Sequence, residues 1–553
     1  MSSDSVTSQI IGSALQYASE EMGLALRNAA YSPNIRERMD HSAALFTADG
    51  KLLAQAEHIP VHLGSLPWGL RNLISRCETD GLAFEKGSMI ASNDPYITGT
   101  HLNDVTVLSP IHYDRKLVAF AANKAHHADV GGLVPGNIST KARTLDEEGY
   151  VLEPTYLQKG GRFVATTVDD FSKCSRSPKE RRGDLMAQAA ANTAGERKVL
   201  DLIRKYGLPA FITSVDDSFE HSDALMLSRL SRLAHGTFSA SDTLEGLDGE
   251  DLRIQVEVRV DEAGVDVDYA GTDHQVDYPL NAVFGVTISG AYFVMRCLTG
   301  SDIPANHGAF RRIRIKAPEG SLLNPTRPHP VGAGNVETSQ RNADVLFRAF
   351  SDTLEEVPAA AGGSMNNVMM GGPWKGGWSF YETIGVGLGG AHDSDGMDGI
   401  QANMTNTMNT PVEEIERSYP LLVTRYELRP DSSGAGRTRG GCGLVRAFKS
   451  LADETTLTIV ADRERHSPWG LHGGLGGGRT CLYLRRGRKE KRLPTKTKRT
   501  FKKGDEVIIM TAGGGGYGRP GLRPRDKVLA DVQKGLLTEG RAKRDYSLPS
   551  RSG

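Results

Sequence analysis

The chain of 553 residues is too long for a single hydrophobic core, which stops growing at about 250–300 residues, so we expect two or three packed units. Its 39% hydrophobic and 24% charged residues are typical of globular proteins and exclude a fibrous or disordered chain. The 66 Lys and Arg residues nearly cancel the 67 Asp and Glu residues, which removes the electrostatic basis for a nucleic-acid or membrane partner.

The five cysteines lie far apart and form no CxxC pair. The sequence therefore predicts neither a disulfide framework nor a thiolate zinc site, and it favours a reducing compartment. The first residues lack the basic, apolar and small-residue segments of a signal peptide, and no run of about 18 apolar residues occurs. We expect a cytoplasmic protein without a membrane span.

The first half of the chain alternates helical and strand patterns. Apolar residues spaced three and four apart from Ile11 to Leu26 mark one face of a helix, and Pro33 ends it. The dipeptide Asp49-Gly50 between two apolar runs is typical of a type I′ hairpin turn. In chain order the patterns predict a helix over 7–31, strands at 43–46 and 52–55, a helix from Ser65 to about residue 77, strands at 105–111 and 117–124, and helices over 183–205 and 216–235.

The second half is richer in strands and glycine, and strict alternation of apolar residues from Ile254 to Val260 is typical of a half-buried strand. The patterns predict strands at 254–260 and 265–269, a helix over about 282–298, Gly-rich turns through 362–390, strands at 455–460 and 507–511, and a closing helix over 527–546. We expect an α+β (mixed α/β) protein with an N-terminal α/β unit at 1–245, a β-rich, Gly-rich unit at 246–525 and a helical tail at 526–553.

An antiparallel hairpin in the N-terminal unit carries the strongest candidate site. Two strand-like runs flank the polar segment 114–116, and the numbers of paired residues should therefore sum to roughly 229. This pairing places Asp104 opposite the neighbourhood of His126, since opposed residues in an antiparallel pair lie about 4.5–5.5 Å apart. His101, Asp104 and His126 are then expected to converge at one end of the hairpin.

Two imidazoles and one carboxylate suit a divalent ion such as zinc, manganese or iron, with positions left open for water or substrate. His127 and Asp129 follow closely, as groups that support the ligands or compete with them. Neighbouring side chains of a strand point to opposite faces, so His126 and His127 should not both bind an ion unless the chain bends. The alternative is that these histidines are ordinary hydrogen-bonded residues of a polar loop.

Other motifs give weaker evidence of a functional site. His58 and His62 lie four residues apart, but Pro60 between them argues against a helical metal pair and favours packing or substrate lining. The sequence contains neither a GxSxG elbow nor a GxxxxGK[ST] phosphate loop. The basic tract at 485–503 has Phe501 as its one interleaved aromatic residue, which favours a solvated hairpin or a protein-contact surface over a nucleic-acid site.

Several segments, taken together and in order, resemble the hydantoinase B family, which includes N-methylhydantoinase, ATP-dependent 5-oxoprolinase and caprolactamase components and the acetone carboxylase alpha subunit. The resemblance extends over most of the chain, and the joint pattern is far more specific than any single motif. The segments include MDHSAALFTADGKLLAQAEHIPVHLGS, NDPYITGTHLNDVTV, KAHHADVGG, GAGNVETSQR, DRERHSPWGLHGG and GGGGYGRP.

The resemblance implies a metal site and a partner. In the carboxylase members two histidines and an aspartate hold a divalent metal, and that pattern falls on His101, Asp104 and His126. The family further implies a hydantoinase A-type subunit, in an A2B2 or larger assembly, that binds ATP and Mg and phosphorylates a carbonyl oxygen of a small cyclic amide. The B subunit would then complete ring opening, with Asp129 or Glu148 orienting a ligand or acting as base.

Two other interpretations stay open. The same family and metal also fit an ATP-dependent ketone carboxylase of the acetone carboxylase type, although those alpha subunits are typically longer than this chain. The third interpretation is a non-catalytic structural subunit, whose histidines fold a loop and whose basic tract docks the partner.

Overall fold

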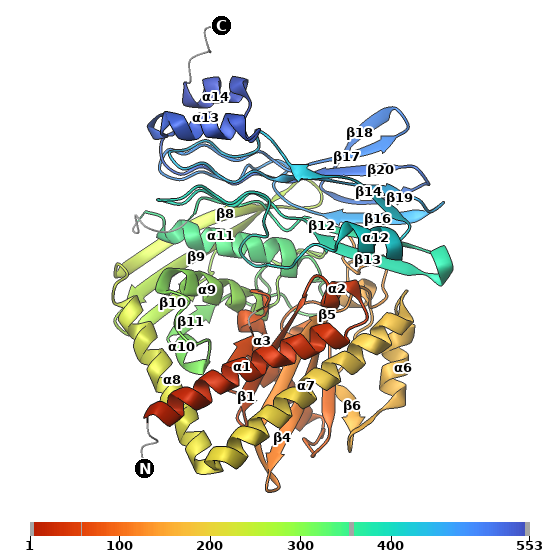
Figure 1. Ribbon diagram of the computed structural model, residues 1–553, viewed down its shortest axis with the longest axis vertical. Helices are drawn as coiled ribbons and strands as arrows, with labels where there is room; N and C mark the ends of the chain where they lie inside the picture. Colours follow the sequence, from red (N-terminus) through yellow and green to blue (C-terminus); the bar gives the residue numbers. More distant parts are fainter. Residues whose placement is uncertain (1–4, 57, 353–358, 548–553) are drawn as a thin grey trace.

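The computed structural model describes residues 5–56, 58–352 and 359–547. Helices and mostly antiparallel sheets alternate through the described chain, which confirms the predicted α+β class. In Figure 1 the elements up to residue 230 occupy the lower part of the molecule, and the strands that follow residue 366 occupy the upper part. All five cysteines are free thiols, as predicted.

A seven-stranded antiparallel sheet forms the centre of the N-terminal half. Side chains alternate along its strands, so Ala43 and Leu45 face one layer of helices while Ala44 and Phe46 face the other. The strand order is β2 (Leu52–Ala56), β1 (His41–Thr47), β5 (Lys116–His126), β4 (Asp104–Tyr113), β3 (Met89–Ser92), β6 (Thr155–Lys159) and β7 (Arg162–Phe163).

Helices cover both faces of this sheet. On one face lie α1 (Ser5–Ala29), α7 (Pro178–Tyr206) and α8 (Leu208–Leu230), whose apolar residues share a core with Ala43 and Leu45. Figure 1 shows α1 and α7 side by side across the strands. On the other face lie α3 (His62–Thr79) and α9 (Phe284–Thr299). The shorter helices of this half are α2 (Pro33–Arg36), α4 (Pro95–Thr98), α5 (Leu145–Glu148) and α6 (Ala165–Lys173).

The hairpin of β4 and β5 forms as predicted, with one change of register. Asp114 and Arg115 have φ of 47° and 64°, the conformation that a two-residue type I′ turn requires. A β-bulge between Ile111 and His112 then shifts the pairing by one residue. As a result, Asp104 lies directly opposite His126.

Three further sheets follow. The second sheet has the strand order β11 (Ile313–Lys316), β10 (Gly264–Asp268), β9 (Asp251–Asp261) and β8 (Gly236–Glu245). The third has the order β13 (Trp378–Thr383), β12 (Asn367–Gly372), β16 (Thr455–Val460) and β19 (Lys496–Phe501). The fourth has the order β14 (Leu421–Leu428), β15 (Leu444–Ser450), β20 (Glu506–Met510), β17 (Cys481–Arg486) and β18 (Lys489–Leu493). The helices are α10 (His307–Phe310), the π-helix η1 (Gly334–Thr338), α11 (Ser339–Phe350), η2 (Trp374–Gly376), α12 (Val412–Ser418), η3 (Pro520–Leu522), α13 (Arg525–Gln533) and α14 (Glu539–Tyr546).

Three local predictions differ from the structure. The turn between β1 and β2 is not type I′, because of its two central residues only Gly50 has positive φ. Helix α3 begins at His62, so Ser65, expected to cap it, lies inside the helix. Its hydroxyl donates to the carbonyl oxygen of Val61, the residue before the helix. The predicted closing helix is split into α13 and α14, since Gly535 adopts φ of 71° just after α13 ends.

The predicted division after residue 245 falls in the turn between β8 and β9, which pair with each other in one sheet. A continuous hydrophobic cluster contains buried side chains from Ala44 to Val460. The division into three units stays a prediction.

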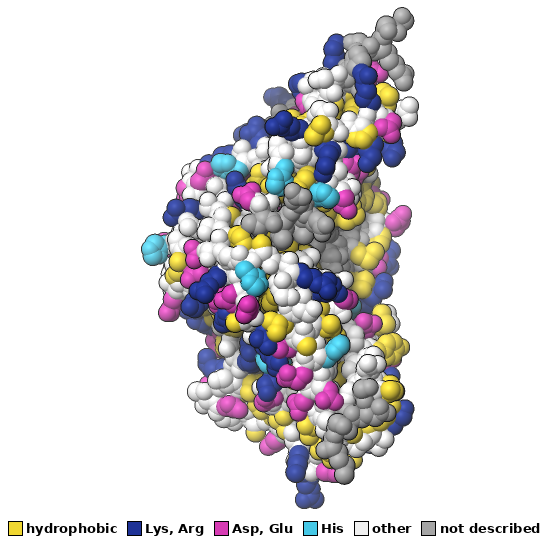
Figure 2. Space-filling model, turned by 90° about the vertical axis from the view of Figure 1, so that its left-hand side faces the viewer, with side chains coloured by type: hydrophobic (Ala, Val, Ile, Leu, Met, Phe, Trp, Pro, Cys, Tyr) yellow, Lys and Arg dark blue, Asp and Glu magenta, His cyan; other side chains and the backbone are white. Residues whose placement is uncertain are grey.

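Charges of both signs are distributed over the surface. Figure 2 shows the face that lies at left in Figure 1, where Lys and Arg side chains are interspersed with Asp and Glu side chains. The basic tract contributes to the β17–β18 hairpin, and Lys489 and Lys491 of its edge strand are exposed. Within the described ranges no helix is both long and apolar enough to cross a bilayer.

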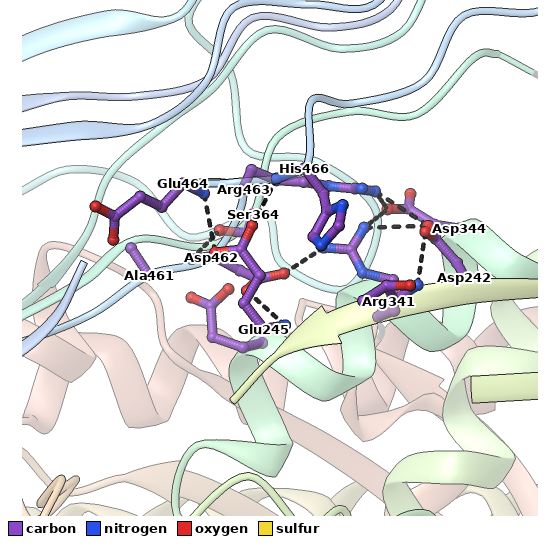
Figure 3. A network of polar contacts seen from close by, with 12 residues as sticks. Asp242, Glu245, Arg341, Asp344, Ser364, Ala461, Asp462, Arg463, Glu464 and His466 are labelled. Carbon is purple, nitrogen blue, oxygen red and sulfur yellow. Dashed lines mark hydrogen bonds and ion pairs between the residues drawn. The ribbon is translucent and has the colours of Figure 1, made fainter. Parts of the chain in front are cut away.

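A buried network of charges ties three parts of the chain together (Figure 3). Arg341 on α11 contacts Asp462, which follows β16, at 2.6 Å and Asp344 at 2.9 Å. Arg463 contacts Asp344 at 2.7 Å, and both arginines lie 3.3 Å from Asp242 on β8. The second sheet, α11 and the segment after β16 are therefore held to one another by ion pairs that water does not screen.

Asp462 is the best point at which to test this network. Its two oxygens contact Arg341 and, at 2.9 Å, Lys496. Burial opposes ionisation of Asp462, but Lys496 and Arg341 outweigh it and hold the pKa of the carboxyl below its usual value. The Asp462→Ala variant should lose about 3–5 kcal/mol of unfolding free energy, because two buried cations lose their partner. Urea denaturation followed by circular dichroism measures this loss.

Asp251 provides a matched control, because it pairs with Arg465 at 2.8 Å and with His466 at 2.9 Å but its side chain is 46% exposed. The Asp251→Ala variant should lose no more than about 1 kcal/mol. Equal losses in the two variants would contradict a stabilising role for the buried network.

Candidate metal centre

Three side chains meet where β4 begins and β5 ends. Asp104 is the first residue of β4, His126 the last of β5, and His101 lies in the turn before β4. The distances are 3.3 Å from His101 Nε2 to Asp104 Oδ1, 3.2 Å from His126 Nδ1 to Asp104 Oδ1, and 3.1 Å between the two nitrogens. All three residues are buried, and they form a group able to hold a metal ion.

The triangle of ligand atoms fits a divalent ion. Metal–nitrogen and metal–oxygen bonds of about 2.0–2.2 Å put neighbouring ligand atoms about 2.8–3.1 Å apart in octahedral geometry and about 3.3–3.6 Å apart in tetrahedral geometry. The three observed edges of 3.1–3.3 Å lie at the boundary between these two ranges. Asp104 Oδ1 makes no aligned hydrogen bond within the described chain, although two imidazole nitrogens lie close to it. Three potential ligand atoms that converge on one point are what a cation requires.

The tautomer of His101 is fixed by the backbone. Its Nδ1 lies 3.0 Å from the carbonyl oxygen of Gly332, which can only accept, so Nδ1 carries the proton and Nε2 offers a lone pair. Burial lowers the pKa of His101, but Asp104 outweighs it and the net shift is upward. The arrangement is that of a metal-binding histidine, whose second nitrogen donates to a backbone oxygen.

Asp104 is oriented by His62 at the start of α3. His62 Nε2 lies 3.4 Å from Asp104 Oδ2, and His62 Nδ1 lies 3.0 Å from the hydroxyl of Ser42. His62 therefore occupies Oδ2 and leaves Oδ1 to the triangle. Burial raises the pKa of Asp104, but His101, His126 and His62 outweigh it and hold that pKa well below its usual value.

His126 is held by elements that are distant in the sequence. Its ring stacks on Tyr381 of β13, with centroids 4.5 Å apart and planes at 25°. Asp40 accepts a hydrogen bond at its backbone oxygen from the His126 amide, and its carboxylate Oδ2 lies 3.8 Å from His126 Nδ1. Burial lowers the pKa of His126. Asp40 therefore supplies a further oxygen beside the triangle.

The neighbouring His127 points elsewhere, as the alternation along a strand predicts. Its Nε2 lies 3.0 Å from the side-chain oxygen of Gln188, and its ring packs edge-on against Phe171. Of the histidines predicted here, His101 and His126 come together and His127 does not. His58 and His62 do not share a helix, because α3 begins only at His62.

The two predicted catalytic carboxylates are both buried. Asp129 contacts Arg176 at 2.9 Å and accepts from the backbone amides of Gly131 and Gly136, so it is committed to its own loop. Glu148 accepts 2.8 Å hydrogen bonds from the backbone amides of Val331 and Gly332, next to the carbonyl that holds His101. Burial raises the pKa of Glu148 to about 7.

A cavity of about 20 Å³ adjoins the candidate centre at His126, which is room for roughly one water molecule. Its lining includes Asp40, His62, His126, Asn335, Tyr381 and Met404. A larger cleft of about 1070 Å³ lies between α1, β2 and α8, and Gln55 in its wall donates to the backbone oxygen of His62. Gln55 thus connects the wall of the cleft to His62, whose side chain contacts Asp104.

Four side chains of this site were not predicted from the sequence as part of a metal centre. Asp40, Asn335 and Tyr381 were not singled out, and His62 was assigned to packing or substrate lining. Asp40 lies beside His126 because His41 pairs with Ala125, and this pairing of distant strands has no signal in the local sequence. Predicting it required knowing that β1 lies next to β5.

Comparisons with known proteins agree over nearly the whole chain. A family model described as Hydantoinase B/oxoprolinase matches residues 4–520. An uncharacterized protein of Methanocaldococcus jannaschii is 44% identical over 99% of this chain and 96% of its own length. A Pseudomonas protein with the provisional name of a D-/L-hydantoinase B subunit is 31% identical over 99% of this chain and 95% of its own length.

Two solved structures share the fold. The crystal structure of the ATP-dependent caprolactamase from Pseudomonas jessenii superposes with a TM-score of 0.92 and 27% identity, covering 100% of this chain and 97% of that one. The nucleotide-free structure of acetone carboxylase superposes with a TM-score of 0.92 and 18% identity, covering 99% of this chain and 80% of that one. The second likeness concerns the fold alone.

We predict that the purified chain carries about one divalent ion, which dialysis against a chelator removes. The His101→Ala and Asp104→Ala variants should lose the ion, because two remaining ligands leave its coordination incomplete. Elemental analysis of the dialysed protein measures the content, and circular dichroism verifies folding. The His127→Ala variant is the matched control and should keep the ion, since that ring faces Gln188. Full metal content in His101→Ala would show that the ion lies elsewhere.

Proposed function

Because the chain belongs to the hydantoinase B/oxoprolinase family, we propose that it is the metal-carrying B subunit of an ATP-dependent cyclic amide hydrolase. Its substrate would be a lactam or hydantoin ring that opens to an amino acid or a carbamoyl amino acid. The observation that carries the proposal is the buried triangle of His101, Asp104 and His126, with edges of 3.1–3.3 Å beside a small cavity.

ATP would be used by a partner. The sequence contains no GxxxxGK[ST] phosphate loop, and a relative of nearly the same length is named as a B subunit. We therefore assign ATP and Mg to a hydantoinase A-type subunit in an A2B2 or larger complex. That subunit would transfer the terminal phosphate of ATP to the amide oxygen, which makes the ring carbon more electrophilic. Water would then add to that carbon, the C–N bond would break as the ring nitrogen takes a proton, and the resulting acyl phosphate would be hydrolysed to a carboxylate and phosphate.

The residues of this chain would then direct hydrolysis. A divalent ion held by His101, Asp104 and His126 would supply a Lewis acid and lower the pKa of water, which falls to about 7 in favourable sites. His62 keeps the Asp104 carboxylate oriented, and Gly332 keeps His101 in the tautomer with a free lone pair. The buried surroundings exclude bulk water and strengthen each electrostatic contact.

A proton acceptor is also needed, and Asp129 and Glu148 are the two carboxylates proposed for it. Glu148 is the better placed, because it binds the peptide of Gly332 that in turn binds His101. Its pKa of about 7 would let it exchange a proton at neutral pH. Asp129 is paired with Arg176, so its part would be to orient the loop that follows β5.

Ketone carboxylation is the second candidate function. The acetone carboxylase likeness favours it by fold, and the same three ligands would serve it equally. A purely structural subunit fits less well, because the buried Asp104 Oδ1 and His126 Nε2 make no hydrogen bonds within the described chain. Unsatisfied polar atoms in a core are destabilising, and binding a ligand offsets that cost.

The test is to copurify the chain with a hydantoinase A-type subunit and to screen lactams, hydantoins and 5-oxoproline for ATP-dependent release of amino acid. Asp104→Ala should lower turnover by roughly a thousandfold or more, since the ion loses its only carboxylate in the triangle. His62→Ala should lower it by about 10–100-fold, the usual effect of removing a group that orients a metal ligand.

The His127→Ala variant controls for a buried histidine outside the triangle and should retain most activity. Ring opening that survives in Asp104→Ala would rule out the proposed centre. Carbon dioxide fixation on a ketone, without lactam opening, would select the carboxylase function instead.

A further inference from the structure

Three buried threonines line the small cavity beside His126, and their hydroxyls form a cluster. Thr383 is the last residue of β13, and Thr405 and Thr407 lie in the stretch 401–411, which contains neither helix nor strand. Oγ1 of Thr407 lies 2.8 Å from Oγ1 of Thr383 and 3.4 Å from Oγ1 of Thr405. Tyr381, two residues before Thr383 on the same strand, stacks on His126. The hydroxyl cluster therefore shares its cavity with the candidate metal centre.

A buried guanidinium donates to this hydroxyl cluster. Arg38 is fully buried, and its Nη2 lies 2.7 Å from Oγ1 of Thr383 and 3.2 Å from Oγ1 of Thr407. The side-chain amide of Gln401 donates to Thr383 at 3.3 Å, and the backbone N–H of Thr407 donates to Thr405 at 3.5 Å. Each hydrogen bond between the cluster and other groups of the described chain thus brings in a donor.

The three hydroxyls have one proton more than the described chain accepts. Each hydroxyl has one proton to donate, and the cluster contains two hydroxyl–hydroxyl contacts, which use two of the three protons. Within the described residues, none of the three hydroxyls donates to an acceptor outside the cluster. One proton is left, and the cavity is the space that it can face. A buried donor without an acceptor is destabilising, and an acceptor that enters the cavity removes that cost.

The charge behind the cluster favours an acceptor that is an anion. An arginine side chain has five N–H donors, no acceptor and a permanent positive charge, so it polarises the hydroxyls that it contacts. Its Nε is buried without a partner in the described chain, and its one ion pair there is a loose contact of 3.8 Å with Asp40 Oδ2. Asp40 lines the same cavity and would repel an anion. Arg38 offsets that charge, as would a divalent ion at the neighbouring centre.

We propose that Thr383, Thr405 and Thr407, backed by Arg38, form a phosphate-binding pocket that holds the phosphoryl group of the activated substrate. Hydroxyl donors in front of a guanidinium suit an oxyanion of high charge. The link to the substrate rests on the proposed function, in which the ring arrives phosphorylated on its amide oxygen. The acyl phosphate formed by ring opening carries the same group, which leaves as inorganic phosphate. An unphosphorylated amide, such as a peptide bond, lacks the group that this pocket binds.

The cavity must enlarge to take a whole phosphate, because its volume of about 20 Å³ has room for roughly one water molecule. Thr405 and Thr407 belong to the irregular stretch 401–411, which moves more easily than the strand that ends at Thr383. These two threonines would therefore close over a phosphate that is held against Thr383.

Inorganic phosphate is the probe for this pocket. It is titrated into the metal-loaded chain, and binding is followed by phosphorus NMR. Thr405→Val removes one hydroxyl and keeps the branched shape, so it should weaken phosphate binding by about tenfold or more, the usual effect of losing a hydrogen bond to a charged group. Thr383→Val should also weaken it, whereas Thr405→Ser keeps a hydroxyl and should bind as the wild type does. Thr458→Val is the matched control, because its hydroxyl is buried outside this cavity.

Two further readouts separate phosphate binding from support of the fold or of the metal. The metal content and circular dichroism of Thr405→Val should equal those of the wild type. In the complete complex, the ratio of ATP consumed to rings opened should rise in this variant, because an activated ring that is not held loses its phosphate to water and becomes lactam again. A purely structural role would leave that ratio unchanged.

Each outcome decides a separate point. Equal phosphate binding by the wild type and Thr405→Val overturns the pocket, because the ion alone would then hold the anion. A metal-loaded wild type that binds no phosphate overturns it as well. Weaker binding in Thr405→Val, together with a complex that opens no lactam or hydantoin, supports the phosphate pocket and ends the proposed hydrolysis of cyclic amides.

Discussion

The candidate centre depends on one register, the antiparallel pairing of β4 with β5 in the middle of the seven-stranded sheet. Asp104 faces His126 because the bulge between Ile111 and His112 adds one residue to the count from the turn. A slip by one residue would turn every side chain of a strand to the opposite face. The pairing is pinned on both sides, since β1 continues the sheet beyond β5 and β3 continues it beyond β4. Geometry that precise belongs on strands buried in a sheet rather than on a loop.

Around this register the protein concentrates polar groups that a core normally excludes. Asp104, His62, His101 and His126 are almost wholly buried, and two of their side-chain atoms, Asp104 Oδ1 and His126 Nε2, make no aligned hydrogen bond within the described chain. Burial favours the neutral form of an acid, yet three imidazoles keep the pKa of Asp104 well below its usual value. A fold that buries an ionised carboxylate beside three imidazoles loses stability in doing so. The buried ion pairs between α11, β8 and the segment after β16 hold the surrounding layers in register.

The sequence predicted the part of this site that one hairpin supplies. Strand alternation and the polar turn at 114–116 were enough to bring His101, Asp104 and His126 together, and the same alternation correctly turned His127 away. Asp40, Asn335 and Tyr381 come from strand pairings and crossings that no local pattern encodes. Tyr381 reaches His126 only because the third sheet packs over the first. Pro60 argued against a helical metal pair of His58 and His62, and the two residues indeed do not share a helix. The same argument could not predict that His62 contacts Asp104. Short-range periodicity predicts elements, whereas their neighbours are set by the packing of the whole chain.

The small size of the cavity bears on the proposed role of a partner subunit. A lactam amide reacts slowly with water, and each tenfold gain in rate takes about 1.4 kcal/mol from the barrier. The pocket is the size of one water molecule, so it could hold an attacking water beside a bound ion. A cyclic substrate could not diffuse into it freely. Phosphorylation on the partner subunit would make the ring more electrophilic before the ring enters this pocket. Activation and hydrolysis would then be successive steps on two subunits.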